Sequence, residues 1–231
     1  MADVESPAPE PLAPATDLSQ YSHAYDLAQE YLSHAMPPAL PTFFEDIDRF
    51  MFGGLHRKCI YVIAGRTREG KSSLALSMAR RMAVVGKARV LYLSLEMSKL
   101  ELVERMLCQT LLVPIAQLVA HRTNGILRAR LAESMKSLQP SWLHIEDEKG
   151  AQIDQIELLL EDKIEQPIDV LIIDHLQHIP MQYGVSRADA ISTYMADLKA
   201  LAKRRNLVVI LCSQINRQGN EKPSLIHLKG S

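Results

Sequence analysis

The stretch GRTREGKSS, residues 65–73, is the part of the chain that decides its fold class. The pattern G-x-x-x-x-G-K-[ST], which binds phosphates, is matched by Gly65 and by Gly70 with the lysine and serine that directly follow it. In this pattern the loop backbone and the start of the next helix bind phosphates, Lys71 reaches the β/γ oxygens and the Ser72 hydroxyl ligates Mg²⁺. The expected nucleotide-binding residues are Gly65, Arg66, Thr67, Arg68, Glu69, Gly70, Lys71, Ser72 and Ser73.

The interior of this loop carries three charges, on Arg66, Arg68 and Glu69, where a polyanion is expected to bind. Residues between the two glycines contribute mainly backbone groups to such a site, so we expect their side chains to point to water. Glu69 is the difficult residue, because a carboxylate close to the phosphates would repel them.

The segments around the loop predict a mainly parallel α/β sheet that is covered by helices on both faces. An apolar run, residues 60–64, leads into the loop as a strand, and Leu74, Met78, Met82 and Val85 follow at helical spacing. Four further apolar runs, separated by helical patterns, are typical of strands buried on both faces. These strands are expected at 89–95, 141–147, 169–174 and 207–214, with helices after the capping box Ser98/Glu101, over 153–164 and around 191–201.

Polar side chains stand at the ends of these strands, where parallel sheets bind ligands. Asp174 would hold the Mg²⁺ shell, or else cap the next turn. Glu96 would take a proton from the attacking water, or else be a first-turn acid of the next helix. Gln214 would report on the γ-phosphate, or else be a surface polar residue. For His175 and His178 a packing or hydrogen-bonding role is favoured over a metal pair, because no third ligand is in sight.

Composition indicates an ordinary soluble globular protein, with 231 residues, 47% of them hydrophobic and 23% charged, and a net charge of -1. A net charge near zero predicts no general attraction to nucleic acid, so any such site must be local. Cys59, Cys108 and Cys212 are far apart and indicate buried thiols in a reducing, cytoplasmic setting. We expect no membrane segment, since no apolar run approaches the ~20 residues needed to span a bilayer.

The chain divides into three predicted parts. Residues 1–16 are rich in proline and alanine and predict a disordered tail. Residues 17–40 predict a linker helix and a proline-rich connector, in which the helix either packs on a neighbouring subunit or leads loosely into the domain. Residues 41–231 predict the folded domain.

Several motifs occur in a fixed order: PTFFEDIDRFMFGGLHRK (41–58), YVIAGRTREGKSSLA (61–75), YLSLEMS (92–98), DVLIIDHLQHI (169–179), LVVILCSQINRQ (207–218) and KPSLIHLKGS (222–231). In this order they resemble the C-terminal ATPase domain of DnaB-like replicative DNA helicases, which are RecA-type ATPases of superfamily 4. The resemblance covers most of residues 41–231. SLEM and SQINR distinguish this group from recombinases and from general ATPases.

The resemblance implies a RecA-like phosphate-loop NTPase in a homo-oligomeric ring, usually a hexamer. Such a ring hydrolyses ATP between subunits, moves 5′ to 3′ along single-stranded DNA, and has replication partners such as a loader or a primase. By similarity, Lys71 and Ser72 bind phosphates and Mg²⁺, and Glu96 is the catalytic glutamate. Asp174 is the second acidic motif and Gln214 the coupling residue.

The resemblance also implies two DNA-facing loops. They correspond to residues 182–190, with Arg187, and 217–231, with Arg217 and Lys229. Basic side chains that line a groove are typical of proteins that bind along single-stranded nucleic acid. Without the resemblance, these charges fit solvated loops equally well.

The chain departs from the family pattern at several positions. Gly65, Thr67 and Ser72 stand where the family usually has Ala, Pro and Thr, and His175 stands where Tyr is common. Gly230 replaces an acid that the family pattern has after the basic residue.

The family's N-terminal helical domain, final strands and trans-acting finger are not found in the 231 residues. We therefore expect a domain that is incomplete at its C-terminal end, with one side of the sheet unpaired. The alternative to a helicase core is a truncated RecA-fold regulatory or interaction module that binds nucleotide without unwinding. A strand-pairing filament protein is a third possibility, which SLEM disfavours.

Overall fold

The computed structural model describes residues 22–33, 38–120, 125–136, 138–139, 142–147, 152–162, 166–178 and 185–215. They fall into two compact units, divided after Pro37. The described part of the first unit is helix α1 (Ala24–Ser33), none of whose residues is buried. This helix lies inside the predicted linker segment 17–40, whereas the predicted tail, residues 1–16, lies outside the described residues.

The second unit is built on a five-stranded sheet with the order β1-β5-β4-β2-β3. All four neighbouring pairs of strands are parallel, which confirms the predicted sheet. The strands are β1 (Cys59–Gly65), β2 (Val90–Ser94), β3 (Leu143–Glu146), β4 (Val170–Asp174) and β5 (Val208–Gln214). Each lies within two residues of a run expected from the sequence.

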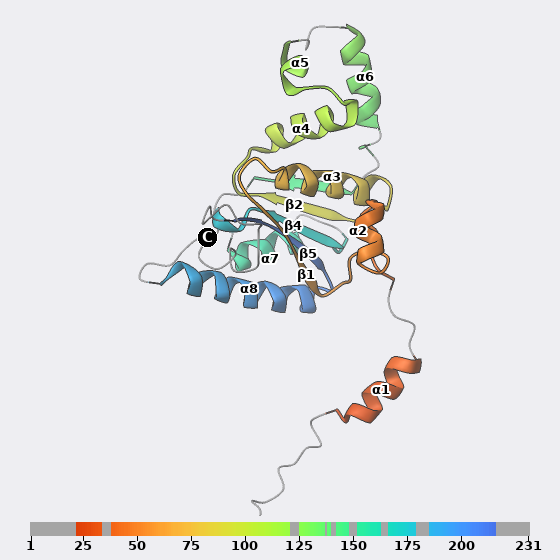
Figure 1. The fold of residues 1–231 in the computed structure, drawn as a ribbon, viewed down its shortest axis with the longest axis vertical. Helices are drawn as coiled ribbons and strands as arrows, with labels where there is room; N and C mark the ends of the chain where they lie inside the picture. The colour runs from red at the N-terminus through yellow and green to blue at the C-terminus, as the bar shows by residue number, and fades with distance from the viewer. Residues whose placement is uncertain are drawn as a thin grey trace, which may run out of the picture. The chain divides into compact units, whose positions relative to one another are not determined.

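Helices cover the sheet on both faces, as Figure 1 shows. Helices α3 (Lys71–Val84) and α4 (Lys99–Leu111) pack on one face, and α7 (Ile153–Asp162) and α8 (Arg187–Arg204) pack on the other. Successive strand residues point to opposite faces, so Ile172 packs with the α3 cluster and Ile173 with the α8 cluster. Every residue of β2 and β4 is therefore buried.

Local sequence signals account for several helix boundaries. Ser98 caps α4 by accepting a hydrogen bond from the Glu101 amide, and the Glu101 side chain accepts one from the Ser98 amide. This confirms the predicted capping box. Ser186 caps α8 by accepting a hydrogen bond from the Asp189 amide. The cap of α3 is Gly70, whose φ of 89° lies in the left-handed region that favours glycine.

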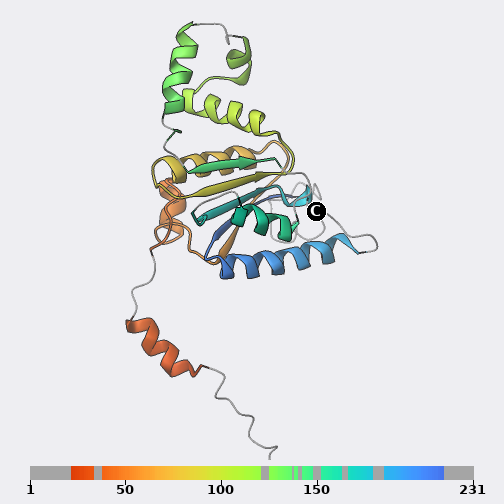
Figure 2. The ribbon, with the colours of Figure 1, turned by 180° about the vertical axis from the view of Figure 1, so that it is seen from behind.

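Four elements were not expected from the sequence: α2 (Glu45–Phe50), α5 (Ile115–Ala120), α6 (Gly125–Lys136) and the 3-10 turn η1 (Leu176–His178). Figure 2 shows α5 and α6 beyond α4, on the side of α4 that faces away from the sheet. Leu127 is the buried residue of α6. A helix that buries so little has a weak apolar stripe, which is why periodicity did not predict it.

Strand β1 lies at one edge of the sheet and, among the described strands, pairs with β5 alone. Val62, in the middle of β1, is 45% exposed. In the described part of the domain, the strand that leads into the phosphate loop therefore has one side that pairs with no other strand. No helix in the described residues is both long and apolar enough to span a membrane.

Candidate nucleotide site

The carboxyl ends of four neighbouring strands bring the predicted site residues to one edge of the sheet. Gly65 at the end of β1 is in register with Gln214 at the end of β5, and Ser94 at the end of β2 is in register with Asp174. The Leu95 amide donates a 2.7 Å hydrogen bond to the Asp174 carbonyl, which joins the segments just beyond β2 and β4. The phosphate loop, Gln214, Asp174 and Glu96 therefore follow neighbouring strand ends.

The phosphate loop leads straight from β1 into α3. Lys71 is the first residue of α3, and its ammonium donates to the Arg66 carbonyl across 2.9 Å. Ser72 and Ser73 lie in the first turn and are half-buried, and the Gln109 side chain donates to the Ser73 carbonyl across 3.0 Å. The first turn of α3 is thus held from behind by α4, with its amide end facing the loop.

Two of the charged loop side chains behave differently from each other. Arg68 is exposed, in agreement with a side chain that points to water. Glu69 is also exposed, but its Oε2 accepts a 2.5 Å hydrogen bond from the Arg66 amide. Both side chains are thus exposed, as expected, but the Glu69 carboxylate also closes the turn back to Arg66, a contact that the sequence did not indicate.

Asp174 is a buried carboxylate at 3% exposure. Its Oδ2 accepts a 2.6 Å hydrogen bond from the Tyr92 hydroxyl, while its Oδ1 has no hydrogen-bond partner in the described part of the chain. Strand alternation places Asp174 on the α3 face, the face at whose helix start Ser72 lies. A buried oxygen that needs a partner, on the side of a serine hydroxyl, fits a hard cation such as Mg²⁺.

Two neighbours of Asp174 are held neutral by the environment. Burial raises the pKa of Tyr92 well above its usual value, and the Asp174 charge raises it further. Burial also raises the pKa of the Cys212 thiol, with Asp174 adding to the rise and Lys71 opposing it. Cys212 is therefore the buried thiol expected from the sequence, whereas Cys59 and Cys108 are only half-buried.

Glu96 stands beside His175. Its Oε2 lies 3.2 Å from His175 Nδ1, and its side chain is 58% exposed, against 9% for the histidine. The buried His175 ring thus contacts the exposed Glu96 carboxylate, which agrees with the hydrogen-bonding role expected for His175. The side chain of His178 lies outside the described part. Among the described residues there is no group of three or more metal-ligating side chains of His, Cys, Asp or Glu.

Gln214 joins the sheet to the phosphate loop. Its side-chain amide donates to the Thr67 hydroxyl across 2.6 Å. Its backbone pairs with the Gln177 side chain, since Gln214 N donates to Gln177 Oε1 across 3.1 Å and Gln177 Nε2 donates to Gln214 O across 3.0 Å. Gln177 was missed by sequence reasoning, and its position two residues past His175, in η1, is the one signal that could have pointed to it.

The predicted DNA-contacting residues are only partly described. Arg187 is exposed and is the first residue of α8, so residues 187–190 are helical, which corrects the loop expected over 182–190. Ser186 provides the cap that starts the helix there. The Arg187 guanidinium donates to the Gln177 carbonyl across 3.2 Å. Arg217 and Lys229 lie outside the described residues.

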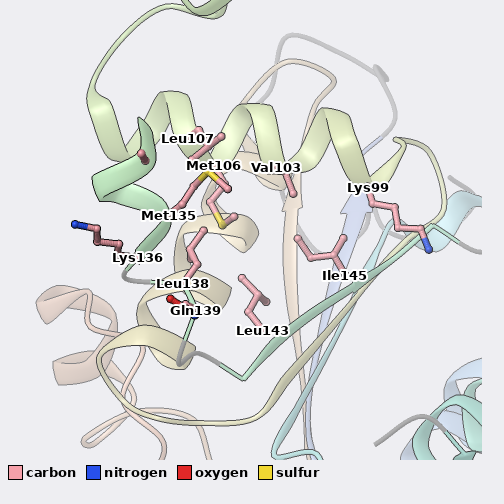
Figure 3. Close-up of a pocket in the computed structure, with 11 residues that line it drawn as sticks. Lys99, Val103, Met106, Leu107, Met135, Lys136, Leu138, Gln139, Leu143 and Ile145 are labelled. Atoms are coloured by element: carbon pink, nitrogen blue, oxygen red, sulfur yellow. The ribbon is translucent and has the colours of Figure 1, made fainter. Parts of the chain in front are cut away.

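A separate cavity of about 700 Å³ lies between α4, α6 and β3 (Figure 3). Its lining is largely apolar and consists of Lys99, Val103, Met106, Leu107, Ala132, Met135, Lys136, Leu138, Gln139, Leu143 and Ile145. None of the predicted nucleotide-site residues is among them, so this cavity is distinct from the strand-end site.

Comparison with known proteins now identifies the family. The model of the DnaB-like helicase C-terminal domain matches residues 39–231. The chain belongs to this family. The match favours the ATPase domain of a DnaB-like replicative helicase over the alternative of a nucleotide-binding interaction module.

The relatives agree with this assignment. The chain is 30% identical to the replicative DNA helicase DnaB of Geobacillus stearothermophilus over 79% of its own length and 41% of the relative's. It is 31% identical to a probable plasmid replicative DNA helicase of Chlamydia trachomatis over 84% of its own length and 44% of the relative's. The chain thus spans less than half the length of these curated relatives.

Solved structures support the RecA-like fold. A DnaB-like replicative helicase, described together with its interactions with primase, superposes with a TM-score of 0.78 at 27% identity, over 90% of this chain and 54% of that one. A second solved structure, described as an ATPase domain, superposes with a TM-score of 0.76 at 25% identity, over 94% of this chain and 78% of that one. The sheet at whose edge the site residues meet is therefore that of the family.

Proposed function

We propose that this domain is the ATP-hydrolysing core of a replicative helicase that moves 5′ to 3′ along single-stranded DNA. The observation that carries the proposal is the meeting of the phosphate loop, Gln214, Asp174 and Glu96 at one edge of the sheet in a DnaB-family domain. The three side chains are the parts that hydrolysis of a bound nucleotide needs: a magnesium ligand, a base and a group that responds to the γ-phosphate.

In the proposed site the phosphate loop binds the ATP phosphates. Loop N–H groups other than those of Arg66 and Glu69, together with the amide end of α3, donate to phosphate oxygens, and Lys71 exchanges the Arg66 carbonyl for the β/γ oxygens. Ser72 and Asp174 would hold Mg²⁺ at this site. Bound Mg²⁺ supplies positive charge that neutralises the phosphate oxygens.

Glu96 is the proposed general base. Its exposed carboxylate accepts a proton from the water that attacks the γ-phosphate, and His175 orients it from the buried side. Gln214 responds to the γ-phosphate while bonded to Thr67 in the phosphate loop. These roles fit hydrolysis in which residues of neighbouring strands act on a single phosphate group.

The DNA and assembly partners follow from the family. We infer a homo-oligomeric, hexameric ring whose channel contacts single-stranded DNA through Arg187, Arg217 and Lys229. Helix α1 is the proposed linker helix, and its exposed apolar side chains, such as Tyr31 and Leu32, suit contact with a neighbouring subunit. A primase is a candidate partner, because one structural relative is described with its primase interactions.

The test is ATP hydrolysis by this chain, measured with and without a single-stranded oligonucleotide. Mg²⁺-dependent nucleotide binding is expected in both conditions, with hydrolysis that rises when the oligonucleotide is present. A purified, folded chain that binds neither ATP nor ADP would exclude the proposal.

A further inference from the structure

We infer that Glu69 is a positioning residue that holds the phosphate loop in its binding shape before nucleotide arrives. The inference rests on the proposed nucleotide binding and adds a role that the motif pattern does not assign, since position 69 is one of its unspecified positions. Three observations carry it: the Glu69–Arg66 hydrogen bond, the backbone angles of the loop, and the space around Gly65.

The backbone N–H and the backbone carbonyl of Arg66 are both held by hydrogen bonds from the following residues. Its N–H donates to Glu69 Oε2 across 2.5 Å, and the Glu69 N–H donates to the Arg66 carbonyl across 3.3 Å. The same carbonyl accepts the Lys71 ammonium across 2.9 Å. Glu69 thus closes the turn over residues 66–69 with both its backbone N–H and its carboxylate.

The backbone inside this turn needs such support. Arg68 has a φ of 68°, in the left-handed region that disfavours residues with a Cβ, and Gly70 follows with a φ of 89°. A non-glycine residue persists in this conformation when its surroundings hold it there. The hydrogen bond from Arg66 to Glu69 spans Arg68, so it is placed to hold that residue.

Gly65 provides the space for the Glu69 carboxylate. A Cβ on Gly65 would lie 3.0 Å from Glu69 Oε2 and 3.4 Å from Lys71 Cγ. The φ of Gly65 does not lie in the left-handed region. The space that Gly65 leaves, rather than its backbone freedom, therefore explains why a glycine stands at this position. The Glu69 carboxylate therefore uses the space that a side chain at position 65 would need. Alanine at position 65 would crowd the Glu69 oxygen that accepts the hydrogen bond from Arg66.

The charge and the acceptor oxygen of Glu69 have opposite consequences for nucleotide binding. A negative charge repels phosphates, whereas an oxygen that holds the Arg66 amide keeps the loop in shape. Glu69→Gln removes the charge and keeps an acceptor oxygen, and Glu69→Ala removes both. The two variants therefore separate positioning from simple repulsion.

The experiment measures the Kd of a fluorescent ADP analogue in excess Mg²⁺ for the parent chain and for the E69A, E69Q, G65A and G65A/E69A variants. We expect E69A to raise the Kd about tenfold, because fewer molecules hold the binding-competent loop. E69Q restores the affinity lost in E69A. G65A raises the Kd in the parent but adds little in the E69A background, since the two changes disturb one arrangement.

A second measurement does not depend on nucleotide. Amide hydrogen exchange of the free chain should be faster at Arg66 in E69A than in the parent, while E69Q and the core strands stay protected. This readout also shows that each variant is folded.

Tighter or equal binding by E69A, with unchanged exchange at Arg66, would overturn the inference and make Glu69 a repelling charge only. Failure of the proposed function looks different. In that case neither the parent nor any variant binds ADP, whatever the rate of amide hydrogen exchange at Arg66. The positioning role is then rejected together with the proposed function.

Discussion

The side-chain amide of Gln214 and the hydroxyl of Thr67 meet across 2.6 Å, which joins the end of β5 to the phosphate loop. Behind this contact, Gln177 pairs with the Gln214 backbone, and Arg187 donates to the Gln177 carbonyl. A continuous set of hydrogen bonds therefore runs from the start of α8 to the loop that is expected to bind phosphate. Such a connection carries a signal only if its members have two arrangements, which mutation can test.

Thr67→Val removes the hydroxyl and keeps the side-chain shape. We expect it to change ATP affinity by less than about threefold and to lower the stimulation of hydrolysis by single-stranded DNA about fivefold, the effect of losing one neutral hydrogen bond. The ratio of ATPase rates with and without oligonucleotide measures this. Thr193→Val, an exposed change on α8, is the matched control. An unchanged ratio in Thr67→Val would remove the contact from any coupling role.

Lys71→Ala should abolish nucleotide binding or hydrolysis, because the loop loses the ammonium that reaches the β/γ oxygens. Lys203→Ala, an exposed change in the last turn of α8, serves as the control for loss of a lysine. Equilibrium binding of ATP and steady-state turnover report the result. Turnover at the parent rate in Lys71→Ala would contradict the phosphate-loop assignment.

Glu96→Gln should keep ATP affinity within a few-fold and slow hydrolysis by roughly 10² or more, because it removes the base and preserves the size of the side chain. Single-turnover hydrolysis after separate measurement of binding gives both quantities. Parent-like hydrolysis would remove Glu96 from the base role, and it would leave no first-turn role either, because α4 begins at Lys99 and its first-turn acid is Glu101.

His175→Phe tests whether the buried ring positions Glu96. We expect a fall in kcat with little change in KM, since the ring contacts the carboxylate rather than the nucleotide. His175→Asn, which keeps a polar group on a short side chain, should recover part of the rate. A loss confined to KM, or equal losses in both variants with reduced folding, would contradict a positioning role.

Two buried tyrosines should respond in opposite directions to loss of the hydroxyl. Tyr92 donates to Asp174, so Tyr92→Phe leaves a buried carboxylate short of a donor and should lower the free energy of unfolding by about 1–3 kcal/mol. The Tyr194 hydroxyl is buried with no partner in the described part of the chain, so Tyr194→Phe should raise that free energy by about 1 kcal/mol. Urea denaturation at neutral pH measures both. If both substitutions change the free energy of unfolding in the same direction, the hydrogen bond of the Tyr92 hydroxyl does not decide its contribution to stability.

Stability should fall at alkaline pH. Burial raises the pKa values of Tyr92, Tyr194 and Cys212 in the folded chain, so on unfolding these groups release protons once the pH passes their unfolded values, about 8.5 for the thiol and about 10 for the phenols. The raised values favour the folded state below the unfolded pKa, and this contribution is lost as the pH rises toward the folded value. Denaturation at pH 7, 9 and 10 is the measurement, and Tyr194→Phe should flatten the upper part of the curve.

Much of this arrangement was predictable because it depends on neighbouring residues. Ser98 and Glu101 specify their own cap, and the apolar runs that end in Asp174 and Gln214 specify buried strands with polar ends. The contacts of Tyr92 and Gln177 were not predictable in this way. They depend on the strand order β1-β5-β4-β2, which decides which distant side chains become neighbours and which spacing alone does not encode.

The contact between Glu69 and Arg66 was not predictable for a related reason. Residue type and spacing indicated a repelling carboxylate at position 69, but the outcome depends on a single rotamer that reaches back to Arg66. Arg187 was placed in a loop because the family pattern marks a segment, whereas the helix start is set by the local cap at Ser186.

The shared space at Gly65 and Glu69 also constrains the order in which this loop could arise by mutation. From a loop with alanine at position 65, acquiring the glutamate first would place its oxygen against a methyl group about 3.0 Å away. Acquiring the glycine first passes through a loop with room to spare. Glycine at position 65 therefore accepts the glutamate without adjustment, whereas alanine there requires the exposed Glu69 carboxylate to move by a few tenths of an ångström.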